Sequence, residues 1–271
     1  MQPSLFTQED LMLRRILVIS LAVGFGIVGI VEFCRIADSF QHNQACRDFA
    51  RRAEEEGIGC MLLQLEPVHR NVLIQPGLLL QQMVPRYDWI EISGNGRRFS
   101  PEAELQLRSL DGVRWISLSR VVITPSLANS LADIAELETV KIDAGCDLSE
   151  LRGRQFNEGI ARPSGIRLDC RDRNDTTAFC QIPMCRSVEA IHVRTSDPSS
   201  DVSEILRTCT SVKNLCVYDY CTQSTSVEIG NKKTLESVNV TYIVECYEPR
   251  RIMLRDLENV KSVALELLAV K

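Results

Sequence analysis

The spacing of aliphatic residues constrains the fold of this chain more than any other feature. In the stretch LRSLDGVRWISL, residues 107–118, aliphatic side chains stand at Leu107, Leu110, Val113, Ile116 and Leu118. The three-residue steps at the beginning suit a helix or a turn, and the two-residue step at the end suits a strand. The same change of spacing recurs along most of the chain. The sequence therefore predicts a repeat protein in which each repeat contributes one short strand.

Eight blocks share this pattern, which can be written 1-x-x-4-x-6 with apolar residues expected at positions 1, 4 and 6. Positions 4 and 6 are Ile, Leu or Val in every block, and position 5 is never a large aliphatic residue. Successive blocks lie 23 to 26 residues apart. The residues at position 6 are Ile92, Leu118, Ile142, Leu168, Val193, Val217, Val240 and Leu265.

This pattern resembles the leucine-rich repeat family over about residues 58–271, since its spacing falls within the roughly 20–29 residues of that repeat. Residues 205–221 are similar to the cysteine-containing subclass, and Cys185 fills the same early place one repeat back. The family's Asn, three residues after position 6, is kept only as Asn95, which predicts less regular turns. The resemblance implies an α/β solenoid: a curved parallel sheet of eight or nine strands, with short helices and loops on its convex side.

The alternative is eight βα units in a doubly wound sheet, but the even spacing and the short segments between blocks favour the solenoid. We expect residues 60–65 to form a ninth, first strand of the same sheet. We also expect helices at 126–137 and 202–209, and a loop with a short helix near 78–83 within 68–84. Residues 264–270 are expected to leave an open, apolar end of the sheet.

The N-terminal part predicts one membrane-spanning helix. Residues 16–31 form an uncharged and mostly apolar run, which reaches spanning length over 11–34 if Arg14 and Arg15 extend toward the lipid headgroups. A polar tail, 1–10, precedes it, and a helical linker, 35–57, follows as an N-terminal cap that ends near Gly57. A cleaved signal peptide is the rival interpretation, but Phe33 is not the small residue that a cleavage site needs. A buried helix of a soluble domain is a third option.

The placement of charges predicts the membrane orientation of this helix, and its small residues predict weak self-association. Arg14 and Arg15 on one side and Glu32 on the other favour a single-pass protein with an extracytoplasmic repeat domain, although arginines beyond the helix leave the orientation open. The small pairs Ser20/Gly24 and Ala22/Gly26 permit close approach of two such helices.

Composition bounds the remaining possibilities. A chain of 271 residues with 45% hydrophobic and 25% charged residues is typical of a folded protein. Its net charge of −5 argues against nucleic acid as a partner. Eleven cysteines without a C-x-x-C pair leave buried free thiols and disulfides as open alternatives.

No catalytic motif is present in the sequence. The three histidines have no partner at metal-ligand spacing, and the chain lacks a P-loop and a G-x-S-x-G elbow. Cys216 and His192, at position 5 of consecutive blocks, are the best candidates for a nucleophile and its base, but no third orienting group stands out. We therefore expect a non-enzymatic protein without cofactor or metal. The alternatives are a structural, self-associating membrane protein and an enzyme that uses the repeats as scaffold.

Positions 3, 5 and 7 point away from the predicted interior, because strand side chains alternate. They predict a binding face with an aromatic pair beside a basic centre, suited to a protein or polymeric ligand that is acidic or bears carbohydrate. Alternatively, residues 68–84 cover the tryptophans, and Asp143 and Asp169 neutralise the cations. The predicted binding residues are Trp89, Trp115, Lys141, Arg167, His192, Arg194 and Tyr218.

Overall fold

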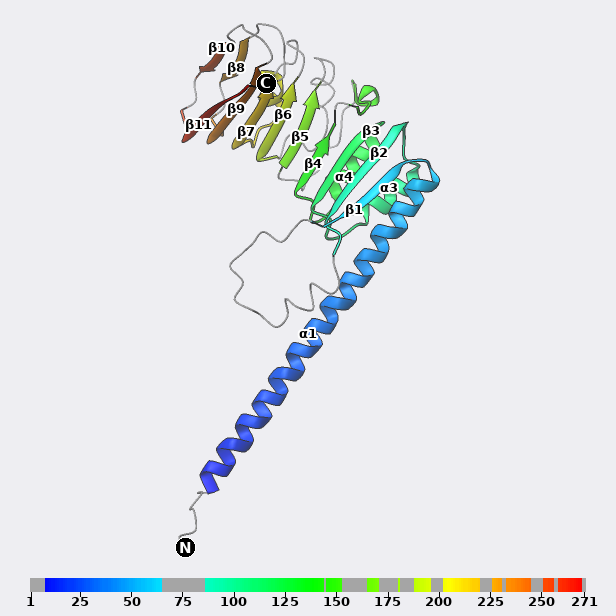
Figure 1. The fold of residues 1–271 in the computed structure, drawn as a ribbon, viewed down its shortest axis with the longest axis vertical. Coiled ribbons are helices and arrows are strands. Elements are labelled where there is room, and N and C mark those ends of the chain that lie inside the picture. Colours follow the sequence, from blue (N-terminus) through cyan, green and yellow to red (C-terminus); the bar gives the residue numbers. More distant parts are fainter. Residues whose placement is uncertain are drawn as a thin grey trace. The chain divides into compact units, whose positions relative to one another are not determined.

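One nine-stranded sheet dominates the computed structural model of this α/β chain (Figure 1). Its strands follow the order β1-β2-β3-β4-β5-β6-β7-β9-β11, and every neighbouring pair is parallel except β1 with β2. The strands are β1 (Gly59–Leu63), β2 (Trp89–Arg97), β3 (Trp115–Val121), β4 (Thr139–Ile142), β5 (Gly165–Cys170), β6 (Ala190–Thr195), β7 (Asn214–Asp219), β9 (Ser237–Val244) and β11 (Ser262–Ala269).

The structure describes most of the chain, in segments. These are residues 8–64, 86–143, 145–152, 165–170, 180, 188–195, 202–219, 226–230, 233–244, 251–255 and 258–269. The predicted loop at 68–84, with its short helix, lies outside them. The chain divides into two units, residues 1–44 with 66–86 and residues 45–65 with 87–271, and the sheet belongs to the second.

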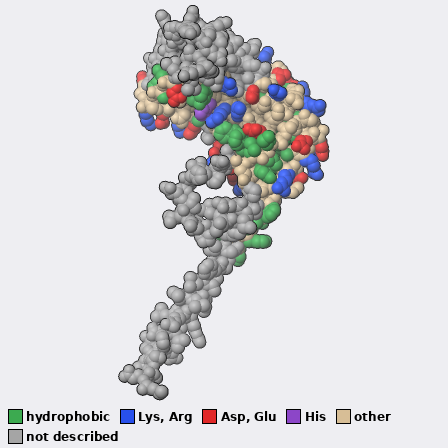
Figure 2. Space-filling view, viewed as in Figure 1, with side chains coloured by type: hydrophobic (Ala, Val, Ile, Leu, Met, Phe, Trp, Pro, Cys, Tyr) green, Lys and Arg blue, Asp and Glu red, His purple; other side chains and the backbone are tan. Residues whose placement is uncertain are grey.

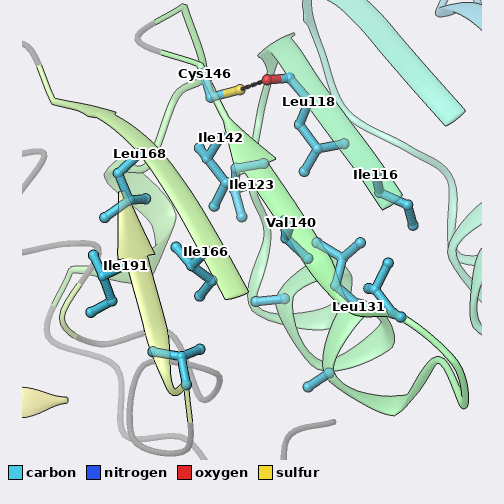
Figure 3. Packing of buried hydrophobic residues seen from close by; sticks show 14 of the residues in the cluster. Ile116, Leu118, Ile123, Leu131, Val140, Ile142, Cys146, Ile166, Leu168 and Ile191 are labelled. Atoms are coloured by element: carbon cyan, nitrogen blue, oxygen red, sulfur yellow. Dashed lines mark hydrogen bonds between the residues drawn. The ribbon is translucent and has the colours of Figure 1, made fainter. Parts of the chain in front are cut away.

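The strand pairing matches the block positions predicted from the sequence. Ile116 pairs with Val140 and Leu118 pairs with Ile142, so positions 4 and 6 of consecutive blocks lie side by side. The same register continues from β4 through β11. In Figure 3 these side chains point to one side of the strands, where they form the hydrophobic core with Leu131 of the covering helix. The predicted register of the blocks is confirmed.

A thiol supports a turn where the family's Asn is missing. Cys146 lies just after Gly145, which stands in the place of that Asn, and its Sγ donates to the carbonyl oxygen of Leu118 at 3.3 Å (Figure 3). Burial raises the pKa of Cys146 to about 11, so the thiol stays protonated and keeps its donor hydrogen. The Leu118 carbonyl also accepts from the amide of Asp143 at 2.9 Å, so the buried thiol adds a second hydrogen bond to this carbonyl.

Helix α1 (Gln8–Glu55) is continuous through both predicted N-terminal helices. In the predicted cap segment Cys46, Phe49 and Ala53 are buried in the core, and Gly57 follows the helix with φ +74°. Side chains of α1 are described from Ile30 onward except at residue 32, and among described side chains no helix is both long and apolar enough to cross a membrane. Most side chains of the predicted spanning segment, 11–34, are not among those described, and neither are those of its small-residue pairs.

The predicted first strand belongs to the sheet but runs opposite to the repeat direction. β1 is antiparallel to β2, and Cys60 pairs with Ile92, whereas the block pattern had placed Leu65 in that row. β1 follows the tight turn after α1, and no repeat precedes it to set a parallel direction. The expectation of a uniformly parallel sheet is wrong at this edge.

Short helices pack against the core face of the N-terminal strands. They are α3 (Pro101–Arg108), α4 (Pro125–Asp133), the 3-10 turn η1 (Ser149–Leu151) and, further along, α6 (Val202–Thr208). Thr124 caps α4 by accepting from the amide of Leu127, and its hydroxyl donates to the buried Glu104 of α3 at 2.7 Å. The helix predicted over 126–137 ends early, because the chain leaves helical geometry at Ile134 to reach β4. The helix predicted over 202–209 is confirmed as α6.

A second, two-stranded sheet was not predicted. β8 (Ser226–Gly230) pairs in parallel with β10 (Arg251–Arg255), and both come from segments between main-sheet strands (Figure 1). Ile229 of β8 is buried in the core. Helices and loops were expected in these segments, so this expectation is corrected at the C-terminal end. Apolar residues alternate along SVEIG, and RIMLR contains a short continuous apolar run, which were the available signals.

The predicted register can be tested with two leucines that occupy the same block position, one in the core and one at the exposed end of the sheet. Leu118 and Leu265 both occupy position 6, but Leu118 is 0% exposed and Leu265, on the edge strand β11, is 59% exposed. We expect Leu118→Ala to lower the free energy of unfolding by about 2–5 kcal/mol, because it removes buried methyl groups and leaves a cavity. Leu265→Ala should cost much less in urea unfolding of the detergent-solubilised full chain. Equal losses would contradict the register.

Candidate functional site

The beginnings of the strands are fixed by a repeated pair of backbone hydrogen bonds. The carbonyl oxygen of Asp88, at position 2 of its block, accepts from the amides of Arg114 at 2.8 Å and Trp115 at 3.0 Å. The same pattern recurs further along the sheet, where each carbonyl accepts from two consecutive amides at the start of the next block's strand, at slightly different distances. These carbonyls belong to Arg114, Glu189, Lys213 and Glu236. Consecutive strands are thereby held in one register, which decides the side chains that share a face.

The side chains at position 2 alternate in charge, a signal that the sequence analysis missed. They read Asp88, Arg114, Glu138, Ser164, Glu189, Lys213, Glu236 and Lys261. Ion pairs join Arg114 to Glu138 at 2.6 Å, and Lys213 to Glu189 and Lys261 to Glu236 at 2.7 Å each. Exposed pairs of this kind stabilise a fold only slightly. Their main consequence is that the cations along this edge already have partners.

We define the odd face as the side chains at positions 3, 5 and 7, which lie opposite the core. Trp89 and Trp115 pair across β2 and β3, and their ring centroids are 5.7 Å apart at an interplanar angle of 44°. The guanidinium carbon of Arg167, from β5, lies 4.7 Å from the ring centroid of Trp115. Arg167 therefore extends across β4, where the same row carries only Thr139, and Gly165 beside it has no side chain. Trp115 stands between Trp89 and Arg167 in strand order.

Three basic side chains occupy position 5 on adjacent strands. Lys141 pairs with Arg167, and Arg167 pairs with His192. Arg167 is exposed, whereas Lys141 and His192 are half-buried. Burial and then the nearby Arg167 lower the pKa of His192, so His192 is neutral at pH 7. In Figure 2, blue basic side chains and a purple histidine lie next to a group of green hydrophobic side chains.

The remaining predicted residues lie further along the strands. Arg194 and Tyr218 pair across β6 and β7 at position 7, so they share the odd face but are two residues beyond the basic row. The carboxylate of Asp143 accepts from the amide of Gly145 at 3.0 Å and so supports a turn. The side chain of Asp169 lies outside those described, as does the loop at 68–84. The structure thus joins Trp89, Trp115 and Arg167 by direct contact and brings Lys141 and His192 beside them by register.

The aromatic pair has an unusual polar feature. The indole nitrogens of Trp89 and Trp115 are both buried and have no hydrogen-bond acceptor among the described residues. Leaving a buried donor unpaired costs about 1–3 kcal/mol. Departures from good folding chemistry of this kind are expected mainly at functional sites.

The neighbouring thiol does not have the properties of a nucleophile. Cys216 pairs with His192 as expected, but burial raises the pKa of Cys216 and keeps it protonated. Tyr218 forms a hydrogen bond with this thiol, which raises the pKa of Tyr218. Among the residues that the structure describes, no group of three His, Cys, Asp or Glu side chains could hold a metal ion.

No family model, curated protein or solved structure matches this chain. Its function is therefore inferred from the residues of the odd face.

The proximity of Arg167 and His192 gives a pH-dependent signal. We expect the His192 imidazole to titrate below its ordinary pKa of 6.5 in NMR spectra of the full chain. Arg167→Gln should raise that midpoint, but not to 6.5, because burial is the larger cause. Arg108→Gln, an equal charge change on α3, should leave it unchanged.

The same shift predicts how stability depends on pH. The unfolded chain binds the proton of His192 at a higher pH than the folded chain does, so acidification through 6.5 should lower stability. If the titration midpoint of His192 does not change in Arg167→Gln, or changes equally in Arg108→Gln, Arg167 does not act on His192.

Proposed function

We propose that this chain is a membrane-tethered, non-enzymatic leucine-rich repeat protein that binds a protein or polymeric ligand through the odd face. The observation that carries this proposal is the guanidinium of Arg167 placed over Trp115, with Trp89 on the other side and Lys141 and His192 alongside. Trp and Arg are the residue types that most often dominate the energy of protein interfaces. Arg167 is exposed on this face, so its charge is available for recognition.

Three observations support the repeat architecture. The block positions pair in register from β2 to β11, the blocks follow one another at about 25 residues, and position 2 repeats one backbone pattern. In a solenoid of this kind each repeat contacts only its neighbours, and the parallel strands form a broad surface. The odd face would be the concave side of that surface.

The apolar run at 16–31 supports the membrane tether. Extended to 11–34, it has the length and composition of a single spanning helix. The repeat domain would then be held near one membrane surface. We assign it to the extracytoplasmic side from the positions of Arg14, Arg15 and Glu32.

The tether predicts resistance to alkaline carbonate extraction. The full chain should remain in the membrane pellet, and Val23→Asp should shift it toward the soluble fraction, because an acidic residue near the centre of a spanning helix costs about 2.5–3.5 kcal/mol. Leu105→Asp adds the same charge at an exposed position of α3 and should have no effect. Extraction of the unaltered chain by carbonate would contradict the tether.

The binding role predicts loss of partners when the odd face changes. The full chain, cross-linked in its native membrane and captured by an affinity tag, should lose its main partners in a Trp115→Ala, Arg167→Glu double variant. Arg108→Glu reverses one charge on α3 and should retain them. Identical partner lists from the unaltered chain and an equally folded double variant would refute recognition by this face.

A further inference from the structure

The odd face is not only a general contact surface, because its charges converge on one place. Resting on the binding role proposed above, we propose that Arg167 and Lys141 form a subsite for the carboxylate groups of an acidic protein segment, with Trp115 as the positioning residue. The ligand is thus a stretch of chain rich in Asp and Glu, recognised by its side-chain carboxylates.

The first support is that the carboxylates described in the structure do not form ion pairs with these two cations. Within the described part of the chain, neither Arg167 nor Lys141 forms an ion pair, whereas Arg114, Lys213 and Lys261 at the strand starts are each paired with a glutamate. Arg167 and Lys141 occupy neighbouring strands, about 4.8 Å apart, so their positive charges repel one another. An anionic group between them would remove this repulsion.

The second support is the reach of the Arg167 charge. Arg167 lowers the pKa of His192, and it opposes the upward shifts in the pKa of Cys216 and of Tyr218. These residues lie on β6 and β7, so the charge of Arg167 acts on both strands, and the carboxylate of Glu266 acts on Cys216 and Tyr218 in the opposite direction. Because His192 is itself neutral, it adds a hydrogen-bonding ring beside this charge rather than a further cation.

The third support is the position of the guanidinium over the Trp115 ring, 4.7 Å from the ring centroid. A guanidinium that stacks on an aromatic ring keeps the N–H groups along its edge available for a ligand. A carboxylate can accept two parallel hydrogen bonds from that edge, which is the strongest geometry for this pair. Trp115 therefore acts through Arg167 by holding its fork in place.

The same stacking favours a peptide over a polysaccharide. A sugar ring binds an indole by lying on its open surface, but Trp115 already has Arg167 on one side and Trp89 on the other in strand order. The small polar residues of position 3, Thr139, Asn214 and Ser237, offer hydrogen bonds to an extended segment that crosses the strands. Acidic side chains on such a segment would reach Lys141 and Arg167.

The test measures binding of a short fluorescent oligoglutamate peptide to the full chain in neutral detergent by fluorescence anisotropy. We expect binding that weakens with added salt, and no binding of the matching oligoglutamine peptide. Arg167→Gln should weaken oligoglutamate binding about tenfold or more, which corresponds to about 1.4 kcal/mol. Arg108→Gln, which removes the same charge from α3, should leave the affinity unchanged.

The positioning role of Trp115 has its own signature. In the unaltered background Arg167→Lys should weaken binding clearly, because lysine keeps the charge but lacks the planar fork. In a Trp115→Phe background the difference between Arg and Lys at position 167 should shrink. A structural role of Trp115 alone would lower both affinities equally and leave that difference intact.

Several outcomes would overturn the proposal. Equal losses for Arg167→Gln and Arg108→Gln would show a general charge effect, and binding of heparin without oligoglutamate would assign the subsite to a sulfated polysaccharide. The chain could fail to bind oligoglutamate while the Trp115→Ala, Arg167→Glu variant still loses its membrane partners. That result would reject the carboxylate subsite and would still support recognition by the odd face. Unchanged partners in that variant would reject the face itself.

Discussion

In five of the eight blocks, the position 2 carbonyl holds neighbouring strands in register, and the other features depend on this contact. It accepts two amides from the next strand, as Asp88 does from Arg114 and Trp115, so the neighbouring strand has one permitted register. Side chains along a strand alternate between faces, and a slip of one residue would exchange them. Such a slip at β5 would place Ile166 on the odd face and bury Arg167 in the core. The core and the odd face are thus two results of one backbone arrangement.

This arrangement separates stability from recognition along each strand. Ile166 and Leu168 pack into the core, while Arg167 between them contributes little to it. Substitutions at position 5 can therefore change the surface chemistry from strand to strand without disturbing the register. In the turn after β4, the Cys146 thiol also donates to the Leu118 carbonyl.

The sequence predicted what depends on spacing and missed what depends on three-dimensional neighbours. Positions 4 and 6 defined the strands and their faces, and Gly57 marked the end of α1 correctly. The antiparallel direction of β1 could not be foreseen, because it follows from a turn and not from the repeat. The predicted tryptophans and Arg167 share a face as expected. Their contact requires the Arg167 side chain to extend across β4 over Thr139, and the spacing of residues in the sequence does not predict such a contact. The charge alternation at position 2 was readable in the sequence, because it recurs once per block.

The charge of the whole chain limits how an acidic ligand could be recognised. The net charge is −5, so at long range an acidic segment is repelled, and attraction has to come from local basic groups such as the one around Arg167. Salt screens both effects beyond about 8 Å at physiological ionic strength, which leaves the short-range contact dominant. Recognition then depends on a guanidinium already held in position, since a freely rotating side chain would lose more conformational entropy on binding. The indole of Trp115 reduces that loss, which gives a physical reason for the pair of tryptophans to lie beside Arg167 and not elsewhere on the sheet.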